Sequence, residues 1–360
     1  MRPLIIAHRG ASKLAPENTL AAFRAAGAAG ADGIEIDVQM TRDQKLVIAH
    51  DFITDRVANV HYDIFDTDFD TLRELDFGIW KGLEFAGEKI PTLEEVLDIS
   101  RDMKMIHVEL KPYFDRDKDF VDRVLDTIVD MGFEDKVVIT SFQYDLLRQV
   151  KERMPQIRTN ALFLNMESLF LPPVSFWESL GLTNGDPLLE KLPAPQDLNA
   201  LAALAESPDE LDGENGILYQ TIRDRLLALL SNYPKMNLLQ ILEDYVRQAD
   251  VVRYVSQFDF PVDFVGTSFT TCLHDPKLIS RLHANGYQAA PWPMFAESRR
   301  ELRSLIRMQP DVILTDEPEM VLSVIEEEER SHEASSDTAS DSSSSEMPES
   351  PSAEETVPNL

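Results

Sequence analysis

The chain has 360 residues, of which 43% are hydrophobic and 8% aromatic, enough for one large domain or two small ones. Its formal net charge of −30 argues against a nucleic-acid-binding surface, because phosphate backbones require a basic footprint. No stretch holds 18 uninterrupted apolar residues, and a single cysteine, Cys272, excludes a disulfide within the chain. We therefore expect a cytoplasmic protein without a transmembrane segment.

Short β-branched runs alternate with longer amphipathic stretches along most of the chain, a pattern typical of parallel strands connected by helices. The expected strands are Leu4–His8, Gly33–Val38, Met105–Lys111, Lys136–Ser141, Ile157–Phe163, Val262–Gly266, Tyr287–Trp292 and Asp311–Thr315. The expected helices are Asn18–Ala29, Leu93–Arg101, Phe120–Met131, Tyr144–Arg153, Pro276–Ala284 and Glu297–Met308. Eight strands separated by helices close a TIM barrel, so we predict an α/β fold of the (β/α)8 type.

Two segments exceed what a minimal barrel needs. Residues 51–91, after the second strand, carry aromatic and acidic residues and a short predicted helix at Phe69–Leu75. Residues 164–261, after the fifth strand, form a larger insertion with leucine-rich helical sequence at Arg223–Leu230 and Leu238–Val246. A helical subdomain packed on the barrel, a lid or lipid-binding surface in contact with a membrane, and a dimer interface are all compatible with this larger insertion.

The C-terminal segment differs from the rest of the chain in composition. Residues 326–360 are rich in Ser, Glu, Asp and Pro and hold eleven acidic residues against one arginine. Such a segment cannot bury apolar area, so we predict a disordered acidic tail after a barrel domain of residues 1–325.

Polar side chains recur on one face of two expected strands. Because side chains alternate along a strand, Glu35 and Asp37 share the face opposite the neighbouring aliphatic residues, and Glu109 and Lys111 do the same on the next strand. These strand ends meet at the C-terminal mouth of a barrel, where such folds place their active sites. Three carboxylates held together repel one another, and a hard divalent cation such as Mg²⁺ or Ca²⁺ offsets that repulsion with oxygen ligands. The pattern therefore predicts a metal site, whereas a single acid would indicate only a local ion pair.

Two histidines flank this predicted site along the chain. His8 ends the first strand and is followed by Arg9, and His50 follows the apolar run Leu46–Ala49. Histidines have pKa values near neutral and supply a general acid and a general base, while an arginine can bind phosphate with two hydrogen bonds. Taken separately, each of these patterns is common in unrelated proteins.

Their order along the chain is far more specific. It runs His8-Arg9-Gly10, Pro16-Glu17-Asn18-Thr19, Gly30-Ala31-Asp32, Glu35-x-Asp37, Thr41-Arg42-Asp43, His50-Asp51 and Glu109-Leu110-Lys111, and it resumes at Ile90–Val96 and at the closing Pro310–Pro318. This order resembles the glycerophosphodiester phosphodiesterase family. The resemblance covers most of the barrel but neither residues 164–261 nor the tail.

The resemblance implies roles for particular residues. It implies that Glu35, Asp37 and Glu109 bind one divalent metal ion. It implies that His8 and His50 are the acid–base pair and that Arg9 and Lys111 bind the phosphate. Glu17 and Asn18 would organise the first loop near the metal, and residues 51–91 would contribute to a glycerol pocket. For the inward-facing His107, a hydrogen bond to a metal ligand and a buried structural role are both open.

The chain departs from the family pattern at one place. Where relatives have Trp-Thr-x-Asn near the seventh strand, this chain has Trp292-Pro293-Met294-Phe295. Trp292 can still pack against a substrate, but the usual polar neighbours are absent. Together with the unmatched insertion, this departure bears on substrate choice more than on chemistry.

The implied activity is metal-dependent hydrolysis of a glycerophosphodiester to glycerol 3-phosphate and an alcohol. The attacking oxygen is either the neighbouring glycerol hydroxyl, through a cyclic phosphate, or water. Two alternatives remain: a lysophospholipase D acting on lysophospholipids, and a catalytically silent barrel that binds glycerophosphodiesters.

Overall fold

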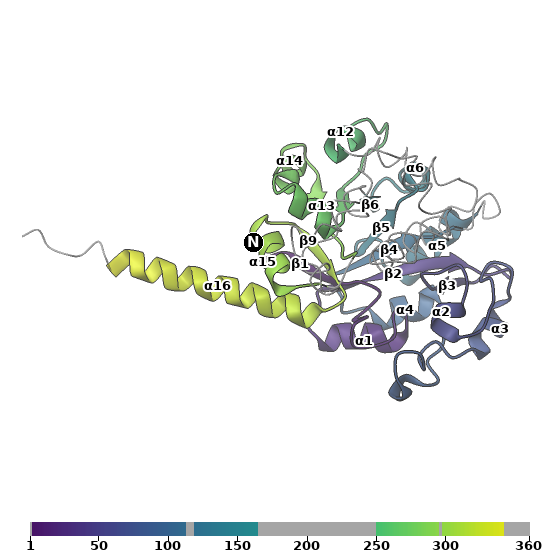
Figure 1. The fold of residues 1–360 in the computed structure, drawn as a ribbon. Coiled ribbons are helices and arrows are strands. Elements are labelled where there is room, and N and C mark those ends of the chain that lie inside the picture. The colour runs from purple at the N-terminus through teal and green to yellow at the C-terminus, as the bar shows by residue number, and fades with distance from the viewer. Residues whose placement is uncertain (1, 113–118, 165–249, 295–296, 342–360) are drawn as a thin grey trace, which may run out of the picture.

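The computed structural model describes residues 2–112, 119–164, 250–294 and 297–341 (Figure 1). Eight parallel strands alternate with helices, and β3 (Leu46–Ile48) pairs with β2 as an antiparallel addition. The other strands are β1 (Leu4–Ala7), β2 (Gly33–Met40), β4 (Met105–Leu110), β5 (Val137–Ser141), β6 (Arg158–Phe163), β7 (Phe264–Thr267), β8 (Gln288–Ala289) and β9 (Val312–Thr315).

The helices cover the outside of the sheet (Figure 1). They are α1 (Leu20–Ala28), α4 (Leu93–Ile99), α5 (Phe120–Met131), α6 (Tyr144–Arg153), α12 (Val251–Val255), α13 (Phe269–His274), α14 (Leu278–Ala284), α15 (Arg299–Arg307) and α16 (Pro318–Asp341). Aliphatic residues on the outer faces of the strands pack against these helices in one core, in which Ile34, Ile36 and Val108 are fully buried. The alternation of strand side chains thus leaves the inner faces for the polar residues.

The strands follow the order β8-β7-β6-β5-β4-β2-β1-β9. Backbone hydrogen bonds from Asp311 to Ala289 (3.1 Å) and from Leu314 to Pro291 (2.9 Å) connect β9 to β8 and its continuation, so the ends of the sheet meet. The predicted TIM barrel is confirmed. The seventh predicted strand, Tyr287–Trp292, is present as the shorter β8, because Pro291 has no N–H to donate to a ladder.

Close packing of the strands requires a glycine at the base of β2. A Cβ atom on Gly33 would lie 1.9 Å from the carbonyl oxygen of Met105 on β4. The side chain is therefore excluded, which lets β2 and β4 pair over six residues from Gly33–Met105 to Val38–Leu110.

The small insertion at 51–91 has its own apolar cluster. It contains α2 (Asp55–Ala58), α3 (Phe69–Glu74) and the 3-10 helix η1 (Leu83–Phe85). Ile64, Leu72 and Phe77 pack there with Val47 of β3, which anchors the insertion to the barrel at the end where β2 finishes. Of the larger insertion, the described part comprises Leu164 and residues 250–261, including α12; the predicted helical sequences at 223–230 and 238–246 lie outside the described residues.

One helix crosses the predicted start of the acidic tail at residue 326. The helix α16 continues through Glu326 to Asp341 and projects from the barrel (Figure 1). Arg299 and Arg303 of α15 both bind Glu327, at 2.5 and 2.7 Å, so contacts with a barrel helix continue past residue 325. Composition predicted no apolar burial there, but these charge pairs with a neighbouring helix do not depend on apolar area. Residues 342–360 lie outside the described part.

No helix in the described ranges is long and apolar enough to cross a bilayer.

Candidate active site

Three carboxylates meet at the C-terminal end of neighbouring strands. Glu35 and Asp37 lie on β2 and Glu109 on β4, where Asp37 and Glu109 are register partners. One oxygen from each of the three lies within 4.8 Å of the others. Glu35 and Asp37 are buried, and the side chain of Glu109 is 12% exposed. The alternation along β2 and β4 thus brings together the three acids that the sequence singled out.

Two cations only partly balance these acids. Lys111 Nζ lies 3.0 Å from Glu109 Oε1 and 3.4 Å from Asp37 Oδ1, and Arg9 Nε lies 3.5 Å from Asp37 Oδ2. Asp37 Oδ1 nevertheless has no hydrogen bond although it is buried. Burial and the charge of Asp37 raise the pKa of Glu35, because the cluster is short of positive charge. A buried carboxylate oxygen without a hydrogen bond, beside two more carboxylates, fits a hard divalent cation.

The loop after β1 holds Arg9 in a backbone conformation that few side chains adopt. Arg9 has a φ of +58° and donates its N–H to Glu35 Oε2 at 2.9 Å. The next residue, Gly10, has a φ of +81°, and a Cβ there would lie 2.7 Å from Ala22 of α1. Glycine adopts this conformation without steric cost, whereas for Arg9 it is costly and is retained because surrounding contacts fix it. The turn directs the Arg9 guanidinium toward the acidic cluster.

Asn18, at the end of the same loop, contacts the cluster directly. Its Nδ2 donates to Asp37 Oδ2 at 2.7 Å, and its own backbone N–H donates to the Arg9 carbonyl at 2.9 Å. Thr19 then caps α1 by accepting from the Ala22 N–H. The loop therefore orients Asp37, one of the three predicted metal ligands.

His8 is held by a residue from the other end of the barrel sequence. Its Nδ1 lies 2.8 Å from Asp316 Oδ1, which follows β9, and Ser12 Oγ donates to the same oxygen at 2.9 Å. Burial and Arg9 act to lower the pKa of His8, but the hydrogen bond and charge of Asp316, together with Glu35, outweigh them and raise it. The bond at Nδ1 leaves Nε2 as the ring atom that can exchange a proton with a substrate.

His50 has the same kind of partner but a different electrostatic environment. Its Nδ1 lies 2.7 Å from Asp51 Oδ1. Burial and the charges of Arg9 and Lys111 lower the pKa of His50 to about 4, against the opposing charge of Asp37 and the bond from Asp51. The backbone around His50 is held by Gln39, whose Nε2 donates to the carbonyls of Ala49 and Asp51 at 2.7 and 2.8 Å.

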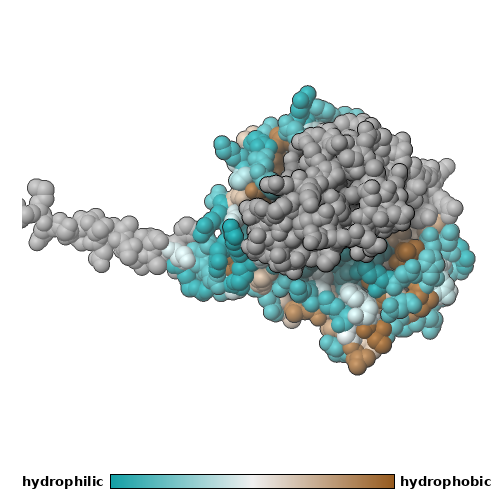
Figure 2. All heavy atoms as spheres, viewed as in Figure 1, coloured by the Kyte–Doolittle hydropathy of each residue, from teal (hydrophilic) through white to brown (hydrophobic). Residues whose placement is uncertain are grey.

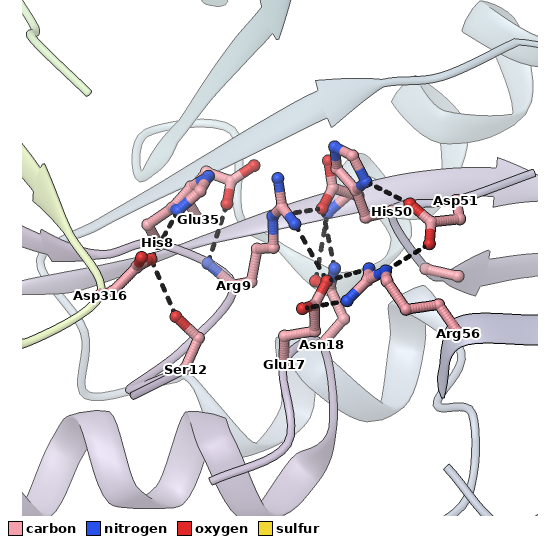
Figure 3. Close-up of polar contacts among 12 residues, drawn as sticks. His8, Arg9, Ser12, Glu17, Asn18, Glu35, His50, Asp51, Arg56 and Asp316 are labelled. Carbon is pink, nitrogen blue, oxygen red and sulfur yellow. Dashed lines mark hydrogen bonds and ion pairs between the residues drawn. The ribbon is translucent and has the colours of Figure 1, made fainter. Parts of the chain in front are cut away.

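Figure 3 shows how these groups lie relative to one another: in this view Glu35 and Arg9 stand between His8 on one side and His50 on the other. Asp316 lies on the outer side of His8 and Asp51 on the outer side of His50, each away from the centre of the site. The arrangement provides two imidazoles and two cationic side chains around one acidic cluster.

Sequence reasoning missed several members of this network. Asp316 and Asp51 lie within motifs of the family pattern, but the sequence predicted no role for them, nor for Arg56 and Glu297. A signal existed for Asp51, which adjoins a histidine. For Arg56, which joins Asp51 to Glu17 with distances of 2.6 to 2.8 Å, sequence spacing gives no such signal, since Glu17 is 39 residues away.

Two of the predicted site residues, His107 and Trp292, lie farther from the three carboxylates. His107 is buried in the barrel, where its ring contacts Met105 Sδ (3.3 Å), Thr140 Oγ1 (3.4 Å) and the edge of Phe264. It makes no hydrogen bond to the three carboxylates within the described residues, which favours its structural role. Trp292 packs edge-to-face on Phe142, and its buried Nε1 has no hydrogen-bond partner.

Comparisons with known proteins agree with this geometry. The family model described as the glycerophosphoryl diester phosphodiesterase family matches residues 8–178. A glycerophosphodiester phosphodiesterase of Caldanaerobacter subterraneus is 39% identical over 188 residues, which are 49% of this chain and 77% of the relative. The chain belongs to the glycerophosphodiester phosphodiesterase family. The family and enzyme class predicted from the sequence are confirmed.

A further relative supports the same assignment, and solved structures support the fold. A glycerophosphodiester phosphodiesterase of Bacillus altitudinis is 35% identical over 164 residues, covering 45% of this chain and 67% of the relative. The structure of an Oleispira antarctica phosphodiesterase in complex with the product sn-glycerol-3-phosphate superposes with a TM-score of 0.60 at 22% identity, covering 90% of this chain and 97% of that one. A Galdieria sulphuraria structure gives 0.58 at 18% identity, with coverages of 89% and 96%. At these identities the solved structures support the fold.

Proposed function

We propose that this chain hydrolyses glycerophosphodiesters to glycerol 3-phosphate and an alcohol in a metal-dependent reaction. The observation that carries the proposal is the pair of carboxylate-held histidines, His8 and His50, around the buried acidic cluster. The relatives named as glycerophosphodiester phosphodiesterases, and the Oleispira enzyme bound to sn-glycerol-3-phosphate, support this substrate class.

In this proposal Glu35, Asp37 and Glu109 hold one divalent ion, Mg²⁺ or Ca²⁺. Asp37 Oδ1, which accepts no hydrogen bond, and the raised pKa of Glu35, caused by burial and by Asp37, both indicate that the site lacks positive charge. When bound, such an ion supplies charge that polarises a phosphate oxygen and makes a coordinated hydroxyl more acidic.

The protein side chains carry the remaining steps. The Arg9 and Lys111 cations bind the phosphate oxygens and stabilise the charge that develops on them. One histidine accepts the proton of the attacking oxygen, either the neighbouring glycerol hydroxyl or water, and the other donates a proton to the departing alcohol oxygen. Because the surrounding charges favour a neutral His50 and a protonated His8, we assign His50 as the acceptor and His8 as the donor.

The test is release of glycerol 3-phosphate from glycerophosphocholine with Mg²⁺, with Ca²⁺ and with EDTA. The variants are His50→Ala and, as a matched control, His61→Ala, since His61 lies in the insertion that follows His50 and pairs with Asp55 at the surface. We expect metal-dependent turnover that is lost in H50A and kept in H61A.

The same assay separates the alternatives. No turnover of glycerophosphocholine by folded protein with either metal would reject the proposed substrate. Hydrolysis of lysophosphatidylcholine in its place would then identify a lysophospholipase D, and binding without turnover of either compound would identify a silent barrel.

A further inference from the structure

One arginine of the small insertion, Arg56, contacts two acidic residues of the site. Arg56, on α2, donates from Nε to Asp51 Oδ2 at 2.6 Å. Its two terminal nitrogens donate to Glu17, from Nη1 to Oε2 and from Nη2 to Oε1, each at 2.8 Å. A planar guanidinium suits this task, because its five donors lie in a fixed fork that a lysine cannot reproduce.

The two partners of Arg56 hold different parts of the proposed chemistry. Asp51 binds Nδ1 of His50, the proposed acid–base residue. Glu17 Oε1 also accepts from Arg9 Nη1 at 2.9 Å, and Arg9 is the proposed phosphate ligand. Figure 3 shows the resulting row, which runs from His50 to Asp51, Arg56, Glu17 and Arg9 and in which the last four side chains alternate in charge.

The position of Arg56 is fixed by the insertion and not by the barrel strands. Thr54, which precedes α2, is fully buried and bonds the backbone of Val60 and Tyr62, closing the turn that carries Arg56. Ala58, at the end of α2, belongs to the apolar cluster of the insertion. The packing of residues 51–91 therefore determines where the guanidinium stands.

We propose that Arg56 is a positioning residue that couples the acid–base residue His50 to the phosphate ligand Arg9 through Asp51 and Glu17. Without Arg56, Glu17 keeps Arg9 as its remaining arginine partner and draws that guanidinium away from the phosphate. Asp51 at the same time loses its arginine and keeps only His50, whose orientation and charge then change. The inference rests on the proposed function, and it makes the small insertion part of the catalytic apparatus.

The test compares Arg56→Met with a matched control, Arg42→Met. Arg42 also forms a two-bond pair with an aspartate of the insertion, Asp68, at 2.8 and 2.6 Å, but it contacts neither histidine. We expect R56M to lose about 100-fold in kcat/KM, divided between a higher KM and a lower kcat, because small displacements of reacting groups are costly. R42M should retain the wild-type values.

Chemical rescue separates positioning from damage to the fold. Arg56→Ala leaves a half-exposed space next to Glu17 and Asp51, so ethylguanidinium added at low, non-denaturing concentration should restore part of kcat/KM in R56A. The same salt should leave Arg42→Ala unchanged. Kinetic constants of folded R56M equal to those of R42M would overturn the proposal, as would the absence of rescue.

A third measurement does not depend on turnover. NMR titration of His50 should show its pKa about one unit higher in R56M than in wild type, because Asp51 is no longer neutralised. If wild type hydrolyses no glycerophosphodiester, the proposed function fails, but this shift would still support the role of Arg56. An unchanged His50 titration would overturn it.

Discussion

His8 and Asp316 stand 308 residues apart in the chain and lie 2.8 Å apart in the barrel. Pairing of β1 with β9, in which Ala7 and Thr315 are register partners, places the two residues that follow these strands next to each other. Closure of the barrel therefore completes the surroundings of one proposed catalytic residue. Glu297 fixes the same corner, accepting from the Asp316 N–H at 2.7 Å and from Thr315 Oγ1 at 2.7 and 2.9 Å.

Substitution of Asp316→Asn should reduce kcat by about 100-fold, since His8 loses the charge that favours its protonated form. The pKa of His8 should fall, so the alkaline limb of the pH–rate profile should move to lower pH. Asp311→Asn is the matched control, because Asp311 binds His283 at 2.8 Å at the other end of β9. A wild-type pH profile in D316N would contradict the proposed role of this pair.

Glu109→Gln should abolish the stabilisation of the protein by Mg²⁺ or Ca²⁺. In metal-free protein the substitution should not lower Tm, because burial and the charge of Asp37 already raise the pKa of Glu109 in spite of Lys111. Thermal unfolding with metal and with EDTA measures both effects. Glu94→Gln, on the exposed face of α4, should retain the full metal-induced shift. Retention of that shift in E109Q would argue against Glu109 as a ligand.

Glu297 should make stability dependent on pH. Burial raises its pKa to about 7, against the hydrogen bond from Thr315, so the folded protein keeps a proton that the unfolded chain releases near pH 4.5. The free energy of unfolding should therefore fall as pH rises from about 4.5 to 7. Above pH 7 the whole of this loss of stability should be present. Glu297→Gln should flatten this dependence. Tm measured between pH 5 and 8 tests it, and an equally steep slope in the variant would exclude Glu297 as its source.

His107→Gln should leave metal-dependent kcat/KM within about threefold of wild type, whereas His50→Gln should reduce it by about 100-fold or more. Burial lowers the pKa of His107 to about 3, so the ring is neutral and serves packing against Phe264. The same substitution type at both positions controls for the change of side chain. A comparable loss in the two variants, with both proteins folded, would restore the alternative that His107 supports a metal ligand.

Much of this fold was determined by local sequence. The period of two along the predicted strands Gly33–Val38 and Met105–Lys111 assigned the inward faces, and seven helices were predicted close to their observed bounds. The same alternation was enough to group Glu35, Asp37 and Glu109, because neighbouring parallel strands end at one edge. The order of motifs from His8 to Lys111 was enough to indicate the family.

Tertiary structure decided the contacts between residues that no period relates. The pairing of His8 with Asp316 depends on the register between the first and last strands, and the bonds of Arg56 depend on how residues 51–91 fold onto the first loop. Helix α16 continues past Glu326 where Arg299 and Arg303 supply charge partners from a neighbouring helix. Composition and periodicity report burial and local conformation, whereas the partner of a charged side chain is set by the three-dimensional approach of distant segments.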